Sequence, residues 1–113
     1  MTILEYVKTK VDIEHDDDDD TFDERLLIDI ETALAELQQL TELELPDDIS
    51  STTTFEDILT TSDNGLLMLC KRFVGICVRL TFDPPSGSVL TSLEKSKDSI
   101  ASRITIQPKE FLQ

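Results

Sequence analysis

The sequence predicts an all-α fold, a small helical bundle of about four helices with a long loop and an extended C-terminal arm. Several segments carry apolar side chains at every third or fourth position, which is typical of amphipathic helices. The chain has 113 residues, a length that suits one domain with one modest core. We therefore expect a single domain over residues 1–113, with the bundle in residues 1–103 and the arm in residues 104–113.

Capping patterns and apolar spacing predict the first two helices. Thr2 and Glu5 have the spacing of a capping box, which indicates a short first helix of about two turns. Thr21 and Glu24 repeat this spacing at the start of a longer helix, expected from about Phe22 to Leu40. The apolar stripe of this longer helix consists of Phe22, Leu26, Leu27, Ile30, Ala33, Leu34, Leu37 and Leu40.

Two segments are expected to be loops. Five consecutive aspartates repel one another and have poor helix propensity, so Asp12–Asp20 predicts an exposed turn. Thr41–Thr54 is rich in acids, Ser and Thr and contains a proline, and it predicts the long loop. Thr53 and Glu56 are spaced to cap a brief helical turn directly after it.

Leu66–Phe82 is the most hydrophobic segment and is expected to be a helix. Val74–Phe82 alone would also fit a buried strand, but it continues the helical stripe of the residues before it. Gly75 lowers the stability of such a helix, which indicates a close crossing with another helix. The predicted core consists of Leu26, Ile30, Leu34, Leu37, Leu69, Phe73, Cys77, Leu80 and Leu93.

The C-terminal third predicts a last helix followed by the arm. Asp83–Gly87 contains two prolines and stops the preceding helix, and Ser88 is expected to cap the next one. The inward side of the last helix is expected to carry Leu90, Leu93, Lys97, Ile100, Ala101 and Ile104. Beyond Ser102 the alternation of apolar residues and Pro108 predict extended chain, which either folds back on the core or docks on a partner. The expected partner-binding residues of this arm are Arg103, Ile104, Ile106, Lys109, Phe111 and Leu112.

Charge is distributed unevenly along the chain. The formal net charge is −14, and residues 1–65 hold 20 acids and 3 bases whereas residues 66–113 hold 4 acids and 7 bases. The acidic half would repel phosphate, which argues against a protein that wraps nucleic acid. This polarity suits a head-to-tail contact between subunits, and it also suits a surface that only favours solubility. The acidic surface is expected at Asp16, Asp17, Asp18, Asp19 and Asp20.

The sequence offers no arrangement that predicts catalysis, a cofactor or a metal ion. His15 is the only histidine and lacks a partner for a triad or a transition-metal site. The aspartate run has neither the glycine nor the spaced ligands of a calcium loop. Cys70 and Cys77 are expected as buried thiols of a protein kept in a reducing compartment. We expect neither a signal peptide nor a membrane span, because Thr2–Lys10 is charged and no apolar run is long enough.

Three stretches resemble one family of viral structural proteins. The N-terminal "LEYVKTKVDI", the acidic turn after it and "FDERLLIDIETALAELQQL" are similar to the start of the head–tail connector (adaptor) proteins of tailed bacteriophages. The later "FDPPSGSVLTSLEKSKDSIASRI" resembles the segment that joins the last two helices in some members.

The resemblance implies a non-enzymatic virion protein at the capsid–tail junction, assembled in the host cytoplasm. Members form a homo-oligomeric ring, usually of about twelve subunits, by repeating one subunit contact around an axis. The ring binds the portal, extends the DNA channel and docks the tail or stopper protein, and DNA passes through without specific binding. An acidic channel wall agrees with this role because it does not attract phosphate.

Two other functions fit the sequence. An acidic DNA mimic would occupy the DNA site of another protein, but its acids would tend to spread over a whole face, whereas here they concentrate before residue 65. A small regulatory or antitoxin-type adaptor would also be acidic, helical and without a catalytic site.

Overall fold

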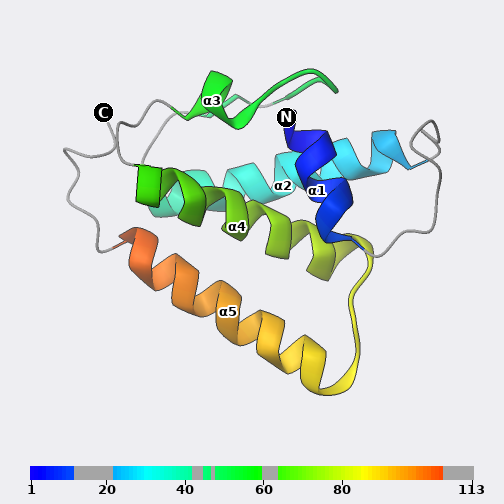
Figure 1. Cartoon of the computed structure of the whole chain (residues 1–113), viewed down its shortest axis with the longest axis vertical. Coiled ribbons are helices and arrows are strands. Elements are labelled where there is room, and N and C mark those ends of the chain that lie inside the picture. Colours follow the sequence, from blue (N-terminus) through cyan, green and yellow to red (C-terminus); the bar gives the residue numbers. More distant parts are fainter. Residues whose placement is uncertain (12–21, 42–44, 47, 60–63, 106–113) are drawn as a thin grey trace.

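The computed structural model describes residues 1–11, 22–41, 45–46, 48–59 and 64–105. It confirms the all-α fold, since these residues form helices and contain no strand. The helices are α1 (Ile3–Lys10), α2 (Asp23–Thr41), α3 (Phe55–Ile58), α4 (Asn64–Phe82) and α5 (Gly87–Thr105) (Figure 1). Helix α4 lies at the centre of the bundle and contacts α1, α2 and α5.

Helices α2 and α4 form the main layer of the core. They run antiparallel, because the Phe22 ring before α2 meets the Phe82 ring at the end of α4 with centroids 5.5 Å apart. The predicted α2 stripe is confirmed, and the predicted helix at Leu66–Phe82 is confirmed over the strand alternative. The residues that these two helices bury are Leu26, Ile30, Ala33, Leu34, Leu37, Thr41, Leu66, Cys70, Phe73, Val74, Gly75, Cys77 and Val78.

Two residues of the predicted core, Leu80 and Leu93, are only half-buried and lie outside it. The reason is the course of α5, which is closest to α4 at its C-terminal end and diverges from it toward the 83–86 connection (Figure 1). Leu80 therefore faces a hollow beside Leu90, while Val74 and Val78 fill the core positions instead. Leu69, another residue of the predicted core, is also half-buried and packs against the core from outside.

The close crossing predicted at Gly75 is confirmed. Helix α1 crosses α4 there, and a Cβ atom added at Gly75 would lie 3.2 Å from Tyr6 Cε1 and 3.3 Å from Lys10 Cγ. Glycine therefore lets the two backbones approach, in spite of its cost to the helix. The predicted capping box of Thr2 and Glu5 is also confirmed, with the Glu5 N–H donating to Thr2 Oγ1 at 3.0 Å.

Side chains of α2 bind two of the described residues between α2 and α3. Gln38 Oε1 accepts a hydrogen bond from the Leu45 N–H at 2.9 Å, and Glu31 Oε2 accepts one from the Ile49 N–H at 3.1 Å. The brief helical turn expected after this segment is α3. Its capping box uses Thr54 and Asp57, one residue later than the predicted pair.

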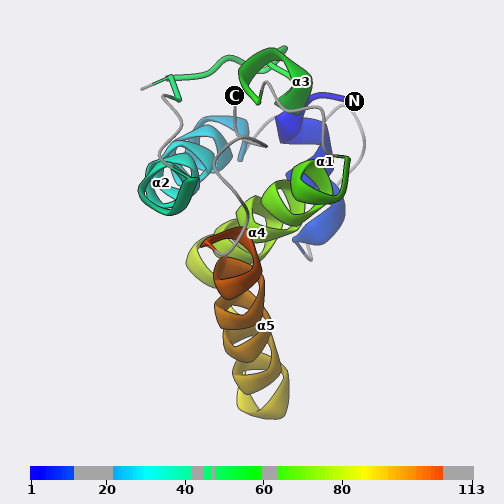
Figure 2. The ribbon, with the colours of Figure 1, turned by 90° about the vertical axis from the view of Figure 1, so that its left-hand side faces the viewer.

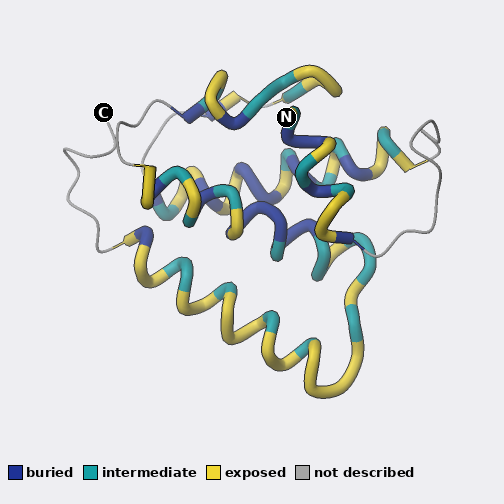
Figure 3. Tube along the Cα trace, viewed as in Figure 1, coloured by how far each residue is buried: buried dark blue, intermediate teal, exposed yellow. Residues whose placement is uncertain are grey.

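Helix α5 begins at Gly87, which has φ of +66°, a conformation that a glycine adopts without strain. We expected the extended arm to begin at Ile104, and this was wrong. The helix continues through Thr105, and Ile104 is only 1% exposed because it lies one turn after Ile100 on the side that faces the core. Elsewhere α5 buries little, as the alternation of exposed and half-buried residues in Figure 3 shows.

Candidate protein-interaction surface

The structure describes only part of the predicted partner-binding set. Arg103 is exposed on α5, whereas Ile104 belongs to the core and cannot contact a partner while the domain is folded. The other predicted residues of the arm and the acidic surface lie outside the described residues: Ile106, Lys109, Phe111, Leu112, Asp16, Asp17, Asp18, Asp19 and Asp20.

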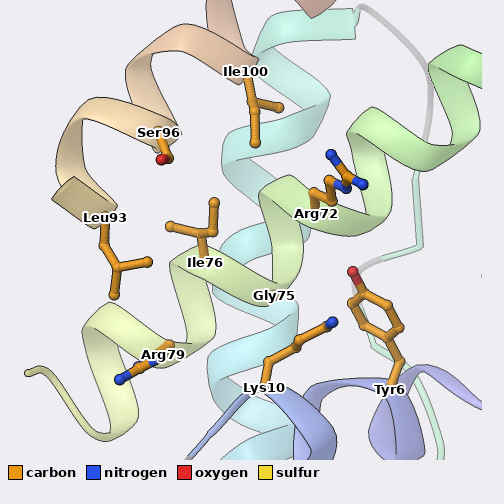
Figure 4. Close-up of a pocket in the computed structure, with 9 residues that line it drawn as sticks. All are labelled: Tyr6, Lys10, Arg72, Gly75, Ile76, Arg79, Leu93, Ser96 and Ile100. Carbon is orange, nitrogen blue, oxygen red and sulfur yellow. The ribbon is translucent and has the colours of Figure 1, made fainter. Parts of the chain in front are cut away.

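An open groove of about 330 Å³ lies between α1, α4 and α5 (Figure 4). We call it the basic groove, and it is lined by Tyr6, Lys10, Arg72, Gly75, Ile76, Arg79, Leu93, Ser96 and Ile100. The Gly75 crossing positions its α1 wall, and the divergence of α5 opens the other side. Ile76, Leu93 and Ile100 give it an apolar floor between the polar groups.

Three positive charges and no acidic residue line the basic groove. Lys10 Nζ lies 5.1 Å from the centroid of the Tyr6 ring, a cation–π distance that fixes one wall. Arg72 and Arg79 are two turns apart on the same side of α4. Within the described part of the chain, Arg79 Nε is buried without a hydrogen-bond acceptor. The three cations of the lining suit a ligand surface that carries carboxylates.

The other flank of α5, away from the basic groove, is acidic. Two open hollows of about 360 and 260 Å³ lie along it, and their acidic lining residues are Glu36, Glu94 and Asp98. Lys97 Nζ lies 3.0 Å from Glu36 Oε2, so the single cation of these hollows is already paired. We call the surface formed by Glu94 and Asp98 the acidic flank.

A small polar network holds α5 to the bundle beneath the acidic flank. Glu36 Oε2 pairs with Lys97 and accepts a long hydrogen bond from the Cys77 thiol at 3.8 Å. Burial would lower the pKa of Lys97, but the hydrogen bond to Glu36 and nearby negative charges outweigh it, and the pKa is raised. The lysine therefore stays charged, and its stem lies along the inward side of α5 as predicted.

The described residues contain no arrangement that supports catalysis or metal binding. No group of three His, Cys, Asp or Glu residues among them could hold a metal ion. Cys70 and Cys77 are buried free thiols, and burial raises their pKa to about 11 and about 12. A thiol with so high a pKa is a poor nucleophile at neutral pH. None of the described helices has the length and apolar character to cross a membrane.

Sequence reasoning missed the basic groove. It assigned Arg72 and Arg79 to no common surface. The sequence does contain a signal for this surface: Arg72 and Arg79 are seven residues apart, which places them on one side of a helix, and the crossing glycine lies between them. The approach of Lys10 from another helix had no signal in the sequence.

Comparison with known proteins agrees with the resemblance found from the sequence. The family described as "Phage connector protein" matches residues 3–110, nearly the whole chain. No curated protein and no solved structure matches the chain. The match extends over all five helices that the structure describes, from the capped start of α1 to beyond the end of α5. The chain therefore belongs to the phage connector protein family, with the head–tail connector role that this membership suggests.

Proposed function

We propose that this protein is one subunit of a homo-oligomeric ring at the capsid–tail junction of a tailed phage. The ring binds the portal on one side, docks the tail or stopper protein on the other, and extends the channel through which DNA passes. The observation that carries the proposal is the family match over residues 3–110. A surface with separate basic and acidic regions, on a helical domain, supports an assembly role.

The composition suits a channel that DNA traverses without binding. A net charge of −14 repels phosphate, so nothing holds the DNA by counterion release. We propose that Asp16–Asp20 contribute to the wall of this channel. Arg103 and the arm residues from Ile106 onward are proposed to contact the portal or the tail, whereas Ile104 anchors the helix that carries them.

Attachment to capsids tests the connector role directly. The purified chain is mixed with portal-bearing capsids that lack the connector, and the particles are imaged by cryo-electron microscopy. We expect ring-shaped density beneath the portal at a single vertex, and none on matched capsids assembled without a portal. Binding that ignores the portal, or no binding at all, would refute the proposal. Capture of a DNA-binding enzyme in place of the portal would instead identify a DNA mimic.

A further inference from the structure

A ring made of identical subunits requires two different surfaces that fit each other, because each subunit contacts its neighbours head to tail. We propose that the basic groove of one copy receives the acidic flank of α5 of the next copy. This inference rests on the proposed ring and names the surfaces that hold it together. It commits to a second copy of this chain as the occupant of the groove.

Charge complementarity between two sites of the same chain is the first argument. Lys10, Arg72 and Arg79 place three cations around the groove with no acidic residue among its lining. On the other flank, Glu94 and Asp98 are exposed and form no ion pair with other described residues. They are four residues apart and therefore project from the same side of the helix. The carboxylates of a neighbour would pair with the cations that line the groove.

The position of α5 makes both surfaces accessible at once. Figure 2 shows its N-terminal half standing away from the other helices. Leu93, Ser96 and Ile100 line the groove, whereas Glu94 and Asp98 lie on the other flank about 100–160° further around the helix axis. A copy that inserts its acidic flank in one neighbour therefore keeps its own groove open for another. Such contacts propagate in one direction and generate a ring where the rotation between copies closes.

Apolar burial would accompany these ion pairs. Leu90 and Leu93 are only half-buried and Val89 is 49% exposed, all on the half of α5 that stands away from the bundle. Covering them would favour association, whereas ion pairs between exposed charges contribute little affinity and mainly determine orientation.

Charge reversal on each surface tests the inference in the full chain. The groove variant is Arg72→Glu with Arg79→Glu, and the flank variant is Glu94→Lys with Asp98→Lys. Each should weaken self-association roughly tenfold or more in sedimentation velocity at low salt. An equimolar mixture of the two variants should recover association, because each provides the complement of the other's altered surface. Wild-type association should weaken between roughly 0.05 M and 0.5 M salt, as screening of the charges increases.

A matched control and a second groove variant keep the result interpretable. Lys95→Glu reverses a charge on the outer side of α5 and should associate as the wild type does. If the double groove variant fails to fold by circular dichroism, the exposed Arg72→Glu alone takes its place. A wild-type chain that stays monomeric at high concentration and low salt overturns the inference. So does a mixture that fails to recover association.

The same variants separate this inference from the proposed function. If the groove variant still forms a ring on portal-bearing capsids, the interface is wrong and the connector role stands. If the mixture recovers association but no ring appears on capsids, the interface stands and the connector role falls.

Discussion

Replacing Gly75 by larger residues compares two effects on stability: a side chain favours helix α4, but it also crowds α1 where the two helices cross. In Gly75→Ala the new Cβ would lie 3.2 Å from Tyr6 Cε1 and 3.3 Å from Lys10 Cγ, so both side chains must yield by a few tenths of an ångström. Alanine also favours the helix over glycine by up to about 1 kcal/mol. Because these effects oppose each other, we expect the free energy of unfolding to change by less than about 1 kcal/mol.

Gly75→Leu should be clearly destabilising. The Tyr6 ring packs edge-on against Phe55 with centroids 5.4 Å apart, so it cannot move away from a larger side chain without losing that contact. Overpacking of this kind costs about 1–3 kcal/mol. The melting temperature should fall by roughly 4 °C or more for each kcal/mol lost. The position of Tyr6 and Lys10 in the basic groove should change as well, since α1 forms one of its walls.

A double-mutant cycle with Tyr6→Ala identifies the cause of this loss. Urea unfolding of the four proteins gives the coupling energy, and Gly75→Leu should cost about 1–3 kcal/mol less when Tyr6 is absent. Met68→Leu, at an exposed position of the same helix, is the control and should leave stability nearly unchanged. Additive effects in the cycle, or a Gly75→Leu variant as stable as the wild type, would refute the argument that Gly75 is required by the crossing.

Four further predictions concern the core, the thiols and the two segments outside the described residues. Phe73→Ala should lower stability by about 3–5 kcal/mol in thermal melting, because the ring is 2% exposed. Cys70 and Cys77 should resist alkylation at neutral pH, because burial raises their pKa to about 11 and about 12. Since the thiols of the unfolded chain ionise near pH 9.0, the free energy of unfolding should fall as the pH rises above about 9. Replacing Asp16–Asp20 by Ser and Asn should preserve the circular dichroism spectrum and trap DNA in assembled particles. Deleting Pro108–Gln113 should leave melting unchanged and weaken attachment to portal-bearing capsids, whereas a less stable monomer would show that the arm folds back.

Periodicity predicted most of the fold because each long helix carries its own apolar stripe. The stripe of α2 and the helical continuity of Leu66–Phe82 depend only on local spacing, and both predictions are confirmed. The crossing at Gly75 was predictable for a similar reason, since a glycine inside a helix needs a packing explanation. Leu80 and Leu93 were misplaced because the angle between α4 and α5 decides their burial, and helix spacing carries no information about that angle.

The candidate site was less predictable from the sequence because it is formed by three separate helices. Lys10, Arg72 and Leu93 meet only after α1 and α5 have both packed along α4. The arm was placed two residues before the end of α5, since Ile104 also lies four residues after Ile100, a spacing that fits a continuing helix. Local patterns therefore identified the elements, whereas tertiary packing decided which charges share a surface.

The burial of Ile104 explains how α5 can stay attached while exposing most of its surface. It is the one fully buried residue among the described residues of this helix, and it lies at the end where α5 meets α2 and α4. The Glu36–Lys97 pair adds a second attachment near the middle, worth little in stability because both groups are partly exposed. Beyond it, the half of α5 that carries Leu90 is covered on only one side. A helix fixed at one end leaves both its acidic flank and the wall that it lends to the basic groove open to neighbours, and its uncovered apolar surface is the area that the proposed ring assembly would bury.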